Sequence, residues 1–262
     1  MMTLALSPLA SNLMTALKKN IIQLPSIGST NSYLAGRAGE FSHGTVVSTY
    51  NQTAGRGQRG NTWESEPEKN LSFSVLLRPQ NIIARQQFYI SEAVSIAIVN
   101  TLRRYITSHE VAIKWPNDIY VDDNKICGIL IENTLAGCNI AQSIAGIGLN
   151  INQRVFLSDA PNPISLIHYI EKETPLDDIL NEVTNEILSI FNHYDTNQQF
   201  DTLHNIYRSM LWRRDGFHPY ATPDGTQFMA CITNVAPDGI LTLTDTQGLS
   251  HPFAFKEVQA IL

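Results

Sequence analysis

Residues 114–130 read KWPNDIYVDDNKICGIL, and this pattern predicts two strands joined by a tight turn. Lys114 ends a strand-like run, and Pro116 forces a turn because its ring fixes φ. Two β-rich segments follow, on either side of a polar tip at Asp123 and Asn124. The stretch therefore predicts a β-hairpin that starts where a lysine, a tryptophan, an asparagine and an aspartate gather at one strand end.

The same turn predicts which side chains share a face of the hairpin. If residues 119–122 pair with 125–131, the alternation of side chains places four of them together. These four are Asp118, Tyr120, Lys125 and Cys127. Lys125 and Asp118 then lie near a cleft, and Gly128 offers a surface without a side chain to a ligand ring. The alternative is a plain hairpin with a core tryptophan and solvated charges.

Residues 50–63, YNQTAGRGQRGNTW, interleave glycines at 55, 57 and 60 with arginines. Glycine allows positive φ and lets backbone N–H groups point at a ligand, and arginine donates two hydrogen bonds at once to a phosphate or carboxylate. Taken alone, such a pattern is more typical of an ordinary flexible surface loop. A loop that closes over an anion is the functional alternative. An RNA-binding box is a third, although such boxes are usually repeated in basic chains.

A third pattern is GIGLN at 146–150, which ends an apolar strand with two glycines and an amide. It fits close approach of a ligand to the backbone, and it fits tight sheet packing equally. It is not a dinucleotide fingerprint, because the third glycine and the following helix are missing. The sequence also lacks GxSxG, HExxH and P-loop patterns, and its scattered histidines predict no metal site.

Strand and helix patterns alternate along the first part of the chain. Strands are expected in IIQL, GTVVSTYNQ, NLSFSVLLRP and EVAIKW, because apolar residues there alternate or run continuously. Ser29 or Thr30 is placed to cap a short helix. Residues 86–106 carry apolar positions at helical spacing and predict a buried helix.

The pattern changes in the last third of the chain. A strongly amphipathic helix is expected with Thr174 as its cap and Pro175 at its first position, followed by a second helix over 197–212. From about residue 214, the turn signals TPDG, APDG and DTQG separate short strands. The chain therefore predicts an α+β fold that ends in a small β module.

Composition limits the classes of function. The chain has 262 residues, 43% hydrophobic and 16% charged, which is typical of a globular protein with a sizeable core. A net charge of -6 opposes nucleic-acid binding, and no apolar run approaches the roughly 20 residues of a membrane span. Residues 1–20 are expected to form a loose lead-in without the basic start of a signal peptide. The well-separated Cys127, Cys138 and Cys231 indicate reduced thiols in a cytoplasmic protein.

Four motifs resemble, in order and spacing, those of biotin–protein ligases: STN at 29–31, Q..AGRGQRGNTW at 52–63, KWPNDIY...K.CGIL at 114–130 and GIGLN at 146–150. The resemblance covers roughly residues 20–262. It implies a mixed-sheet catalytic domain flanked by helices over 1–213 and a small SH3-like β-barrel domain over 214–262. It implies that biotin and ATP form biotinyl-5'-adenylate and pyrophosphate, and that a lysine in the biotin carrier domain of a carboxylase then takes the biotinyl group.

The resemblance also assigns roles to residues. Lys125 and Arg56 are the expected catalytic residues, with Lys125 neutralising the carboxylate of biotin. The expected biotin-binding residues are Ser29, Thr30, Asn31, Gln52, Gly55, Arg56, Gly57, Gln58, Lys125, Gly128 and Gly146. The expected ATP- and adenylate-binding residues are Arg59, Trp63, Asn117, Asp118, Lys125 and Asn150. Magnesium is expected to reach Asn117 and Asp118 with the nucleotide, without a dedicated metal site in the protein.

The chain departs from the commonest pattern of these ligases in two places. Their loop is often GRGRxGR, whereas here Gln58 and Asn61 replace two arginines, and we expect Lys125, Arg56 and Arg59 to suffice. Only about twenty residues precede the resemblance, so a monofunctional ligase is expected, without the N-terminal winged helix-turn-helix of some relatives. A lipoate or octanoate ligase or transferase of the same superfamily is the alternative, and a biotin-responsive regulator is a third hypothesis. Relatives often dimerise through the sheet, which leaves a homodimer open.

Overall fold

The computed structural model describes residues 20–158 and 160–262, and a seven-stranded sheet forms its centre. The strands are β1 (Ile21–Leu24), β2 (Val46–Thr49), β3 (Leu71–Leu77), β4 (Val111–Lys114), β5 (Asp118–Val121), β6 (Asn124–Ala136) and β7 (Asn139–Leu149). They lie in the order β1-β2-β3-β7-β6-β5-β4. β1 and β2 run parallel and the other neighbours antiparallel, so the predicted mixed sheet is confirmed. The lead-in expected over 1–20 lies outside the described residues, apart from Asn20.

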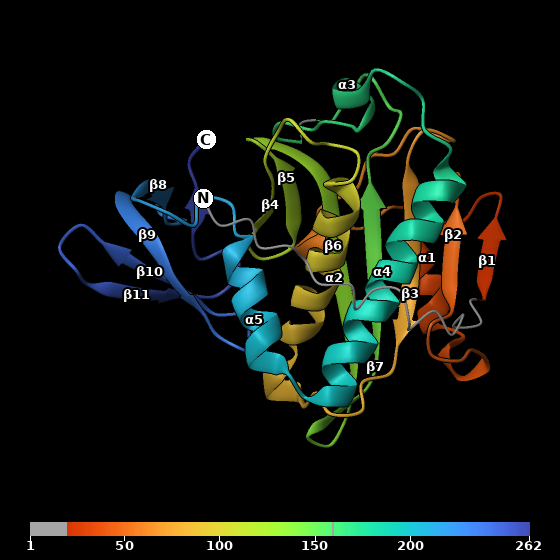
Figure 1. Ribbon diagram of the computed structural model, residues 1–262, viewed down its shortest axis with the longest axis horizontal. Coiled ribbons are helices and arrows are strands. Elements are labelled where there is room, and N and C mark those ends of the chain that lie inside the picture. The colour runs from red at the N-terminus through yellow and green to blue at the C-terminus, as the bar shows by residue number, and fades with distance from the viewer. Residues whose placement is uncertain (1–19, 159) are drawn as a thin grey trace.

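Helices cover both faces of this sheet. The α-helices are α1 (Thr30–Ala35), α2 (Phe88–Leu102), α3 (Ile167–Ile170), α4 (Leu176–Asn197) and α5 (Phe200–Ser209), and short 3-10 turns are η2 (Ala38–Glu40), η3 (Gln58–Gly60) and η4 (Ala84–Gln86). Figure 1 shows α2 and α4 in front of the large sheet and α5 beside α2, toward the small sheet. These helices help to bury the main hydrophobic core. α1 packs on the opposite face, through Leu34. None of the described helices is long and apolar enough to cross a membrane.

The predicted helix over 86–106 is confirmed as α2, and its surroundings explain its composition. It is buried on nearly all sides because it lies between the sheet, α4 and α5. α4, by contrast, has one solvent-exposed side and keeps the amphipathic pattern that predicted it. The apolar residues on all sides of α2 thus reflect its position in the interior of the protein.

One predicted helix start is confirmed and another is wrong. The Ser29 hydroxyl accepts a hydrogen bond from the Ser32 N–H and caps α1. α4 begins at Leu176 with Pro175 as its N-cap, so Thr174 is not the cap. Thr174 instead exchanges two hydrogen bonds with the Asn152 side chain, at 2.9 and 3.0 Å, which hold its backbone outside the helix.

The predicted hairpin 118–131 is confirmed, but its tip and one of its faces differ. β5 ends at Val121 and β6 begins at Asn124, so the turn lies one residue earlier than expected. The register shifts between Ile119 and Tyr120, which places an additional residue in β6. Cys127 consequently pairs with Ile119 in the hydrophobic core and does not share a face with Lys125 and Asp118. Burial there raises the pKa of its thiol.

The predicted β module at the C-terminus is confirmed. Its strands are β8 (His218–Ala221), β9 (Gln227–Val235), β10 (Leu241–Asp245), β11 (Ser250–Phe253) and β12 (Gln259–Ala260), in the antiparallel order β11-β10-β9-β8-β12. Leu241 and Leu243 belong to the same hydrophobic core as α2. The Trp115 indole donates a hydrogen bond to the Gly239 carbonyl at 3.0 Å. The small sheet, on the left in Figure 1, is therefore packed firmly against the large one.

Candidate active site

One cleft, of about 1180 Å³, crosses the sheet face that carries α1 and continues to the C-terminal sheet. Most residues that the sequence motifs singled out line it: Ser29, Thr30, Asn31, Gln52, Arg56, Gly57, Gln58, Trp63, Asn117, Asp118, Lys125, Gly128, Gly146 and Asn150. Gly55 is not among its lining residues, and the side chain of Arg59 lies outside what the structure describes. Segments far apart in the sequence thus meet at one hollow.

A hydrogen-bonded network between α1 and the sheet forms the inner end of the cleft. The Thr30 N–H donates to Gln52 Oε1 at 3.0 Å, and Ser74 Oγ lies 2.7 Å from Thr30 Oγ1 and 2.5 Å from Asn31 Oδ1. Thr30 and Asn31 are each only 3% exposed. A Cβ added to Gly146 would lie 2.2 Å from Asn31 Oδ1, so only glycine fits beneath this amide. These polar groups are held in place by one another before any ligand arrives.

The Trp63 indole covers the middle of the cleft floor. A Cβ on Gly148 would lie 2.2 Å from the indole ring, and one on Gly128 would lie 2.9 Å from it. The Lys125 ammonium is 5.7 Å from the ring centroid, within the range of a cation–π contact. The space that the sequence predicted above Gly128 is therefore occupied by the protein's own indole in this structure, as the space at Gly146 is by Asn31.

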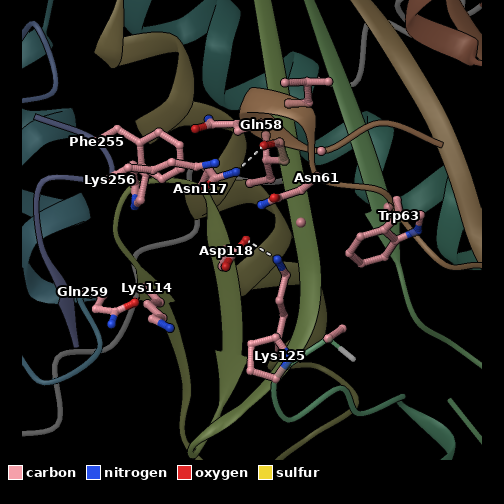
Figure 2. Close-up of a pocket in the computed structure, with 18 of the residues that line it drawn as sticks. Gln58, Asn61, Trp63, Lys114, Asn117, Asp118, Lys125, Phe255, Lys256 and Gln259 are labelled. Carbon is pink, nitrogen blue, oxygen red and sulfur yellow. Dashed lines mark hydrogen bonds and ion pairs between the residues drawn. The ribbon is translucent and has the colours of Figure 1, made fainter. Parts of the chain in front are cut away.

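Two lysines flank one carboxylate at the end of the cleft formed by β4, β5 and β6. Lys125 Nζ lies 2.7 Å from Asp118 Oδ1, with side chains 24% and 19% exposed (Figure 2). Lys114 pairs with Asp118 across β4 and β5 and donates a hydrogen bond to the Tyr120 hydroxyl at 2.7 Å. Burial lowers the pKa of Lys114, and the Asp118 carboxylate opposes that shift. The arrangement presents positive charge to the cleft and suits an anionic substrate.

The glycine–arginine loop is folded into a short hairpin at the rim. The Gly57 N–H donates to the Asn61 carbonyl at 2.7 Å, and the Trp63 N–H donates to the Gly55 carbonyl at 3.1 Å. Gly60 has φ +89°, which favours glycine. Gln58 and Asn61 both line the cleft, and Figure 2 shows their side chains pointing into it. These backbone hydrogen bonds give the loop a defined hairpin conformation in this structure.

Two predicted residues make contacts that differ from their expected surroundings. Arg56 forms an ion pair with Glu132 at 3.2 Å, so its guanidinium is engaged with the protein. Asn150 donates its amide N–H to the Ile164 carbonyl at 3.0 Å and is 2% exposed, so it braces the following loop. Its carbonyl oxygen is buried and has no hydrogen-bond partner among the described residues.

Sequence reasoning missed several residues of the site. The sequence pattern places Lys114 at the strand end of the KWPND motif but gives it no role in the site. Ser74 and Glu132 lie on β3 and β6 without any motif, and only the hydrogen bonds of the folded protein select them. Trp212 comes from after α5, yet its ring lies 5.3 Å from the Tyr120 ring and 5.5 Å from Lys114 Nζ. No local pattern could bring it to this lysine.

Known proteins resemble this chain in sequence and in fold. Residues 24–150 match the Biotin/lipoate A/B protein ligase family. The Bifunctional ligase/repressor BirA of Escherichia coli (strain K12) is 37% identical over 135 residues, covering 52% of this chain and 41% of that protein. The Biotin--[acetyl-CoA-carboxylase] ligase of Paracoccus denitrificans is 34% identical over 126 residues, covering 47% and 51%. The matches thus span about half the length, or less, of these relatives.

Solved structures extend the likeness to almost the whole chain. A biotin protein ligase from Aquifex aeolicus in complex with biotin and ATP gives a TM-score of 0.75 at 22% identity, covering 93% of this chain and 99% of that one. A biotin protein ligase from Leishmania major in complex with biotinyl-5-AMP gives 0.63 at 22% identity, covering 90% and 98%. Residues 24–150 thus resemble the biotin/lipoate ligase family in sequence. The overall fold of the chain is that of the biotin protein ligases.

Proposed function

We propose that this chain is an ATP-dependent biotin–protein ligase. It joins biotin and ATP to form biotinyl-5'-adenylate and pyrophosphate, and it then transfers the biotinyl group to a lysine of a biotin carrier domain. The observation that carries this proposal is the meeting of three features in one cleft: the α1 network, the glycine–arginine loop and the Lys125–Asp118 pair. The names of the relatives support it further.

The first step requires a carboxylate to attack the α-phosphorus of ATP, so two anions must approach each other. A bond forms between a carboxylate oxygen and phosphorus, and the bond from phosphorus to the pyrophosphate oxygen breaks. Lys125, fixed by Asp118 at 2.7 Å, supplies the positive charge between them. Lys114 adds a second cation on the far side of Asp118 and faces the same cleft.

The inner network is proposed to bind the ring of biotin. Ser29, Thr30 and Gln52 offer hydroxyl and amide groups to a ureido ring. The hydrogen bonds of Thr30 to Gln52, and of the Ser32 N–H to the Ser29 hydroxyl, fix the orientation of those groups. Asn31 acts behind them, because both of its N–H donors are already used by Leu130 and Glu132. The backbone of Gly57 and the Gln58 side chain close the rim above.

The nucleotide is proposed to lie toward Trp63, Asn117, Asp118 and Asn150, with Arg59 and Arg56 contributing from the loop. The cleft has room for a nucleotide there, and the indole offers an aromatic face to a base. No group of three or more metal-binding side chains exists among the described residues. Magnesium instead fits as a companion of ATP, held by the oxygens of Asn117 and Asp118, where it neutralises phosphate charge.

The second step needs no nucleophile from this chain, since the attacking amine is the carrier's lysine. That amine attacks the acyl carbon of the mixed anhydride, loses a proton, and releases AMP. The folded loop over the cleft limits hydrolysis of the anhydride until the carrier arrives. The absence of a nucleophilic motif in the sequence agrees with this division of work.

We also propose the domain boundaries, the cellular location and the oligomeric state of the protein. Residues 1–213 form the catalytic domain, and residues 214–262 form an SH3-like domain, which five short antiparallel strands support. A cytoplasmic location is supported by three cysteines that form no disulfide. A homodimer through the sheet stays a hypothesis that sedimentation of the purified protein tests.

The test is the exchange of labelled pyrophosphate into ATP, measured with biotin and, separately, with lipoate or octanoate. Biotin-dependent exchange is expected, followed by transfer to a biotin carrier domain. Pyrophosphate exchange that occurs with lipoate and not with biotin would indicate a lipoate ligase instead. A salt-dependent shift of operator DNA would support a regulator instead.

A further inference from the structure

Glu132, on β6, lies beside the cleft and is not one of its lining residues. Its carboxylate nevertheless touches two elements that define the site. One oxygen accepts a hydrogen bond from Asn31 Nδ2 at 2.8 Å, across 101 positions of sequence. The carboxylate also accepts from Arg56 Nη2 at 3.2 and 3.3 Å, across 76 positions. One side chain on a rigid strand thus joins helix α1 to the glycine–arginine loop.

The Asn31 contact bears on the inner end of the cleft. Asn31 is 3% exposed, and its other N–H donates to the Leu130 carbonyl at 3.2 Å. Its oxygen meets Ser74, which also touches Thr30. Removing the Glu132 acceptor would leave a buried amide donor without a partner, and such losses are costly. Glu132 therefore helps to fix the amide that supports the network.

The Arg56 contact bears on the rim. Arg56 Nη2 also donates to the Ser32 hydroxyl at 3.2 Å, so its guanidinium lies between α1 and β6. The backbone of Arg56 is bridged to Thr62, at the other end of the loop hairpin. The side-chain ion pair links the first half of this hairpin to β6, while the Trp63 indole contacts β6 at the other end. The two loop positions that could have carried further cations are Gln58 and Asn61.

We propose that Glu132 is a positioning residue that holds the glycine–arginine loop closed through Arg56 and, independently, fixes Asn31 at the inner end of the cleft. The loop is anchored to the protein from outside the cleft, in advance of the ligand. The side chains of Arg56 and Glu132 are 48% and 38% exposed. An ion pair this exposed contributes little free energy, so it breaks and forms again readily. A lid that must release product and admit a carrier lysine requires such an adjustable hold.

Two substitutions separate the two contacts. Glu132→Gln keeps an amide oxygen for Asn31 but removes the charge that Arg56 meets, whereas Glu132→Ala removes both. Hydrogen–deuterium exchange is measured on the ligand-free protein, in peptides that cover residues 50–63. Glu132→Gln is expected to speed exchange there by about twofold to fivefold, the range for an exposed ion pair. Exchange in β7 peptides should not change.

Three comparisons make the test specific to the ion pair. Arg56→Gln should speed exchange at least as much as Glu132→Gln does, because it also removes the hydrogen bond to Ser32. The double variant should exchange no faster than Arg56→Gln alone. About 1 M KCl should bring the wild-type protein close to the variants, because salt screens exposed charges. Glu173→Gln breaks a different exposed ion pair, with Lys69 at 2.9 Å, and is the matched control that should leave residues 50–63 unaffected.

The second readout rests on the proposed function. Glu132→Gln should release biotinyl-adenylate about twofold to fivefold faster while biotin affinity stays near wild type. Glu132→Ala should also weaken biotin binding. Unchanged exchange over residues 50–63 in both variants overturns the anchoring role, whatever the reaction is. If the wild-type protein forms no adenylate, the proposed function fails while the exchange result still decides the anchor.

Discussion

The two ends of the cleft are built in different ways. At the inner end, Thr30, Asn31 and Ser74 are almost fully buried and bond to one another. At the rim, the loop from Gly55 to Trp63 is held at its end by the Trp63 indole, which lies over Gly128 and Gly148. The rest of the loop is held by a few backbone bonds and by the half-exposed Arg56 guanidinium, which contacts Glu132 and Ser32. The inner end is therefore fixed by buried contacts, whereas the rim ahead of Trp63 is fixed by exposed ones.

This difference has a physical basis. Recognition of a small neutral ring requires donors and acceptors in set positions, and burial supplies them because unpaired polar groups are costly there. Closure over a reactive intermediate requires contacts that form and break within a catalytic cycle, and exposed contacts of about 1 kcal/mol or less suit that task. Substitutions at the inner end should therefore change binding and chemistry steeply, and substitutions at the rim should change rates of release.

The largest effect is expected for Lys125→Ala, which removes the cation held by Asp118. Adenylate formation should fall by at least about 100-fold, because no other described cation occupies the same position beside that carboxylate. The fold should persist, because the Lys125 side chain is partly exposed and lies outside the core. Pyrophosphate exchange and circular dichroism measure the two parts. Near-normal exchange in a well-folded variant would contradict the role given to Lys125.

Gly146→Ala tests the rigidity of the inner end. Its Cβ would lie 2.2 Å from Asn31 Oδ1, so the Asn31 amide has to move and break its contact with Ser74. Biotin affinity should fall by about 10-fold to 100-fold, in line with a cost of about 1–3 kcal/mol for overpacking. Calorimetric titration measures it. Gly39→Ala is the control, since its Cβ meets nothing within 4 Å, and equal affinities for the two variants would mean that the inner end yields easily.

Gln58→Arg tests the rim. Because Lys125, Arg56 and Arg59 are expected to suffice, a guanidinium at this position of the cleft should change the release of biotinyl-adenylate by less than about twofold and leave ligation unchanged. Release is measured by trapping the free intermediate after rapid dilution. Release slowed by about twofold to fivefold or more, with unchanged ligation, would show that the loop without arginines at positions 58 and 61 is under-charged.

His43 is half-buried and lies away from the cleft, so its titration should change the stability of the fold without changing the site. Its Nδ1 accepts the Arg78 N–H at 3.0 Å and its Nε2 lies 2.9 Å from Asn192 Oδ1, which fits a neutral ring. Burial lowers its pKa from 6.5, so the unfolded chain binds the proton more readily. The free energy of unfolding should therefore fall as the pH drops below about 6.5, where the unfolded chain takes up the proton first.

His43→Gln should remove that part of the pH dependence. The check is urea denaturation at about pH 7.5 and about pH 5.5, where the wild-type protein should lose more stability than the variant. Pyrophosphate exchange by the two proteins at the higher pH should agree. An equal loss of stability in both proteins would show that His43 is not the titrating group.

The sequence predicted the elements well where one residue pattern dominates. The valine- and isoleucine-rich runs became strands, and α2 and α4 formed where the helical spacing placed them. The misses were local. The bulge at Ile119 and Tyr120 moved Cys127 into the core, and the Asn152 amide drew Thr174 away from the helix start. The first depends on an irregular strand pairing, and the second depends on a side chain 22 positions away in the sequence. Rules of alternation and capping consider only neighbouring residues, so they predict neither.

Local sequence patterns predicted only part of the candidate site. Motifs singled out Lys125, Asp118 and the glycine–arginine loop, because charged and glycine residues at fixed spacing stand out in any sequence. The direction of the Arg56 side chain was not predictable, because Glu132 has no motif of its own. The use of Gly146 to admit Asn31 was equally hidden, since a glycine pattern does not say which atoms approach it.

By itself, the sequence determined the α+β class, the order of the strands along the chain, and the residue types of an anion-handling site with a glycine-rich rim. Those properties follow from periodicity and from the chemistry of single residues. Only the tertiary structure decided which groups are partners: Asn31 with Ser74, Arg56 with Glu132, and Lys114 with Trp212. Such pairs join residues far apart in the chain, and packing and register, which no local pattern encodes, bring them together.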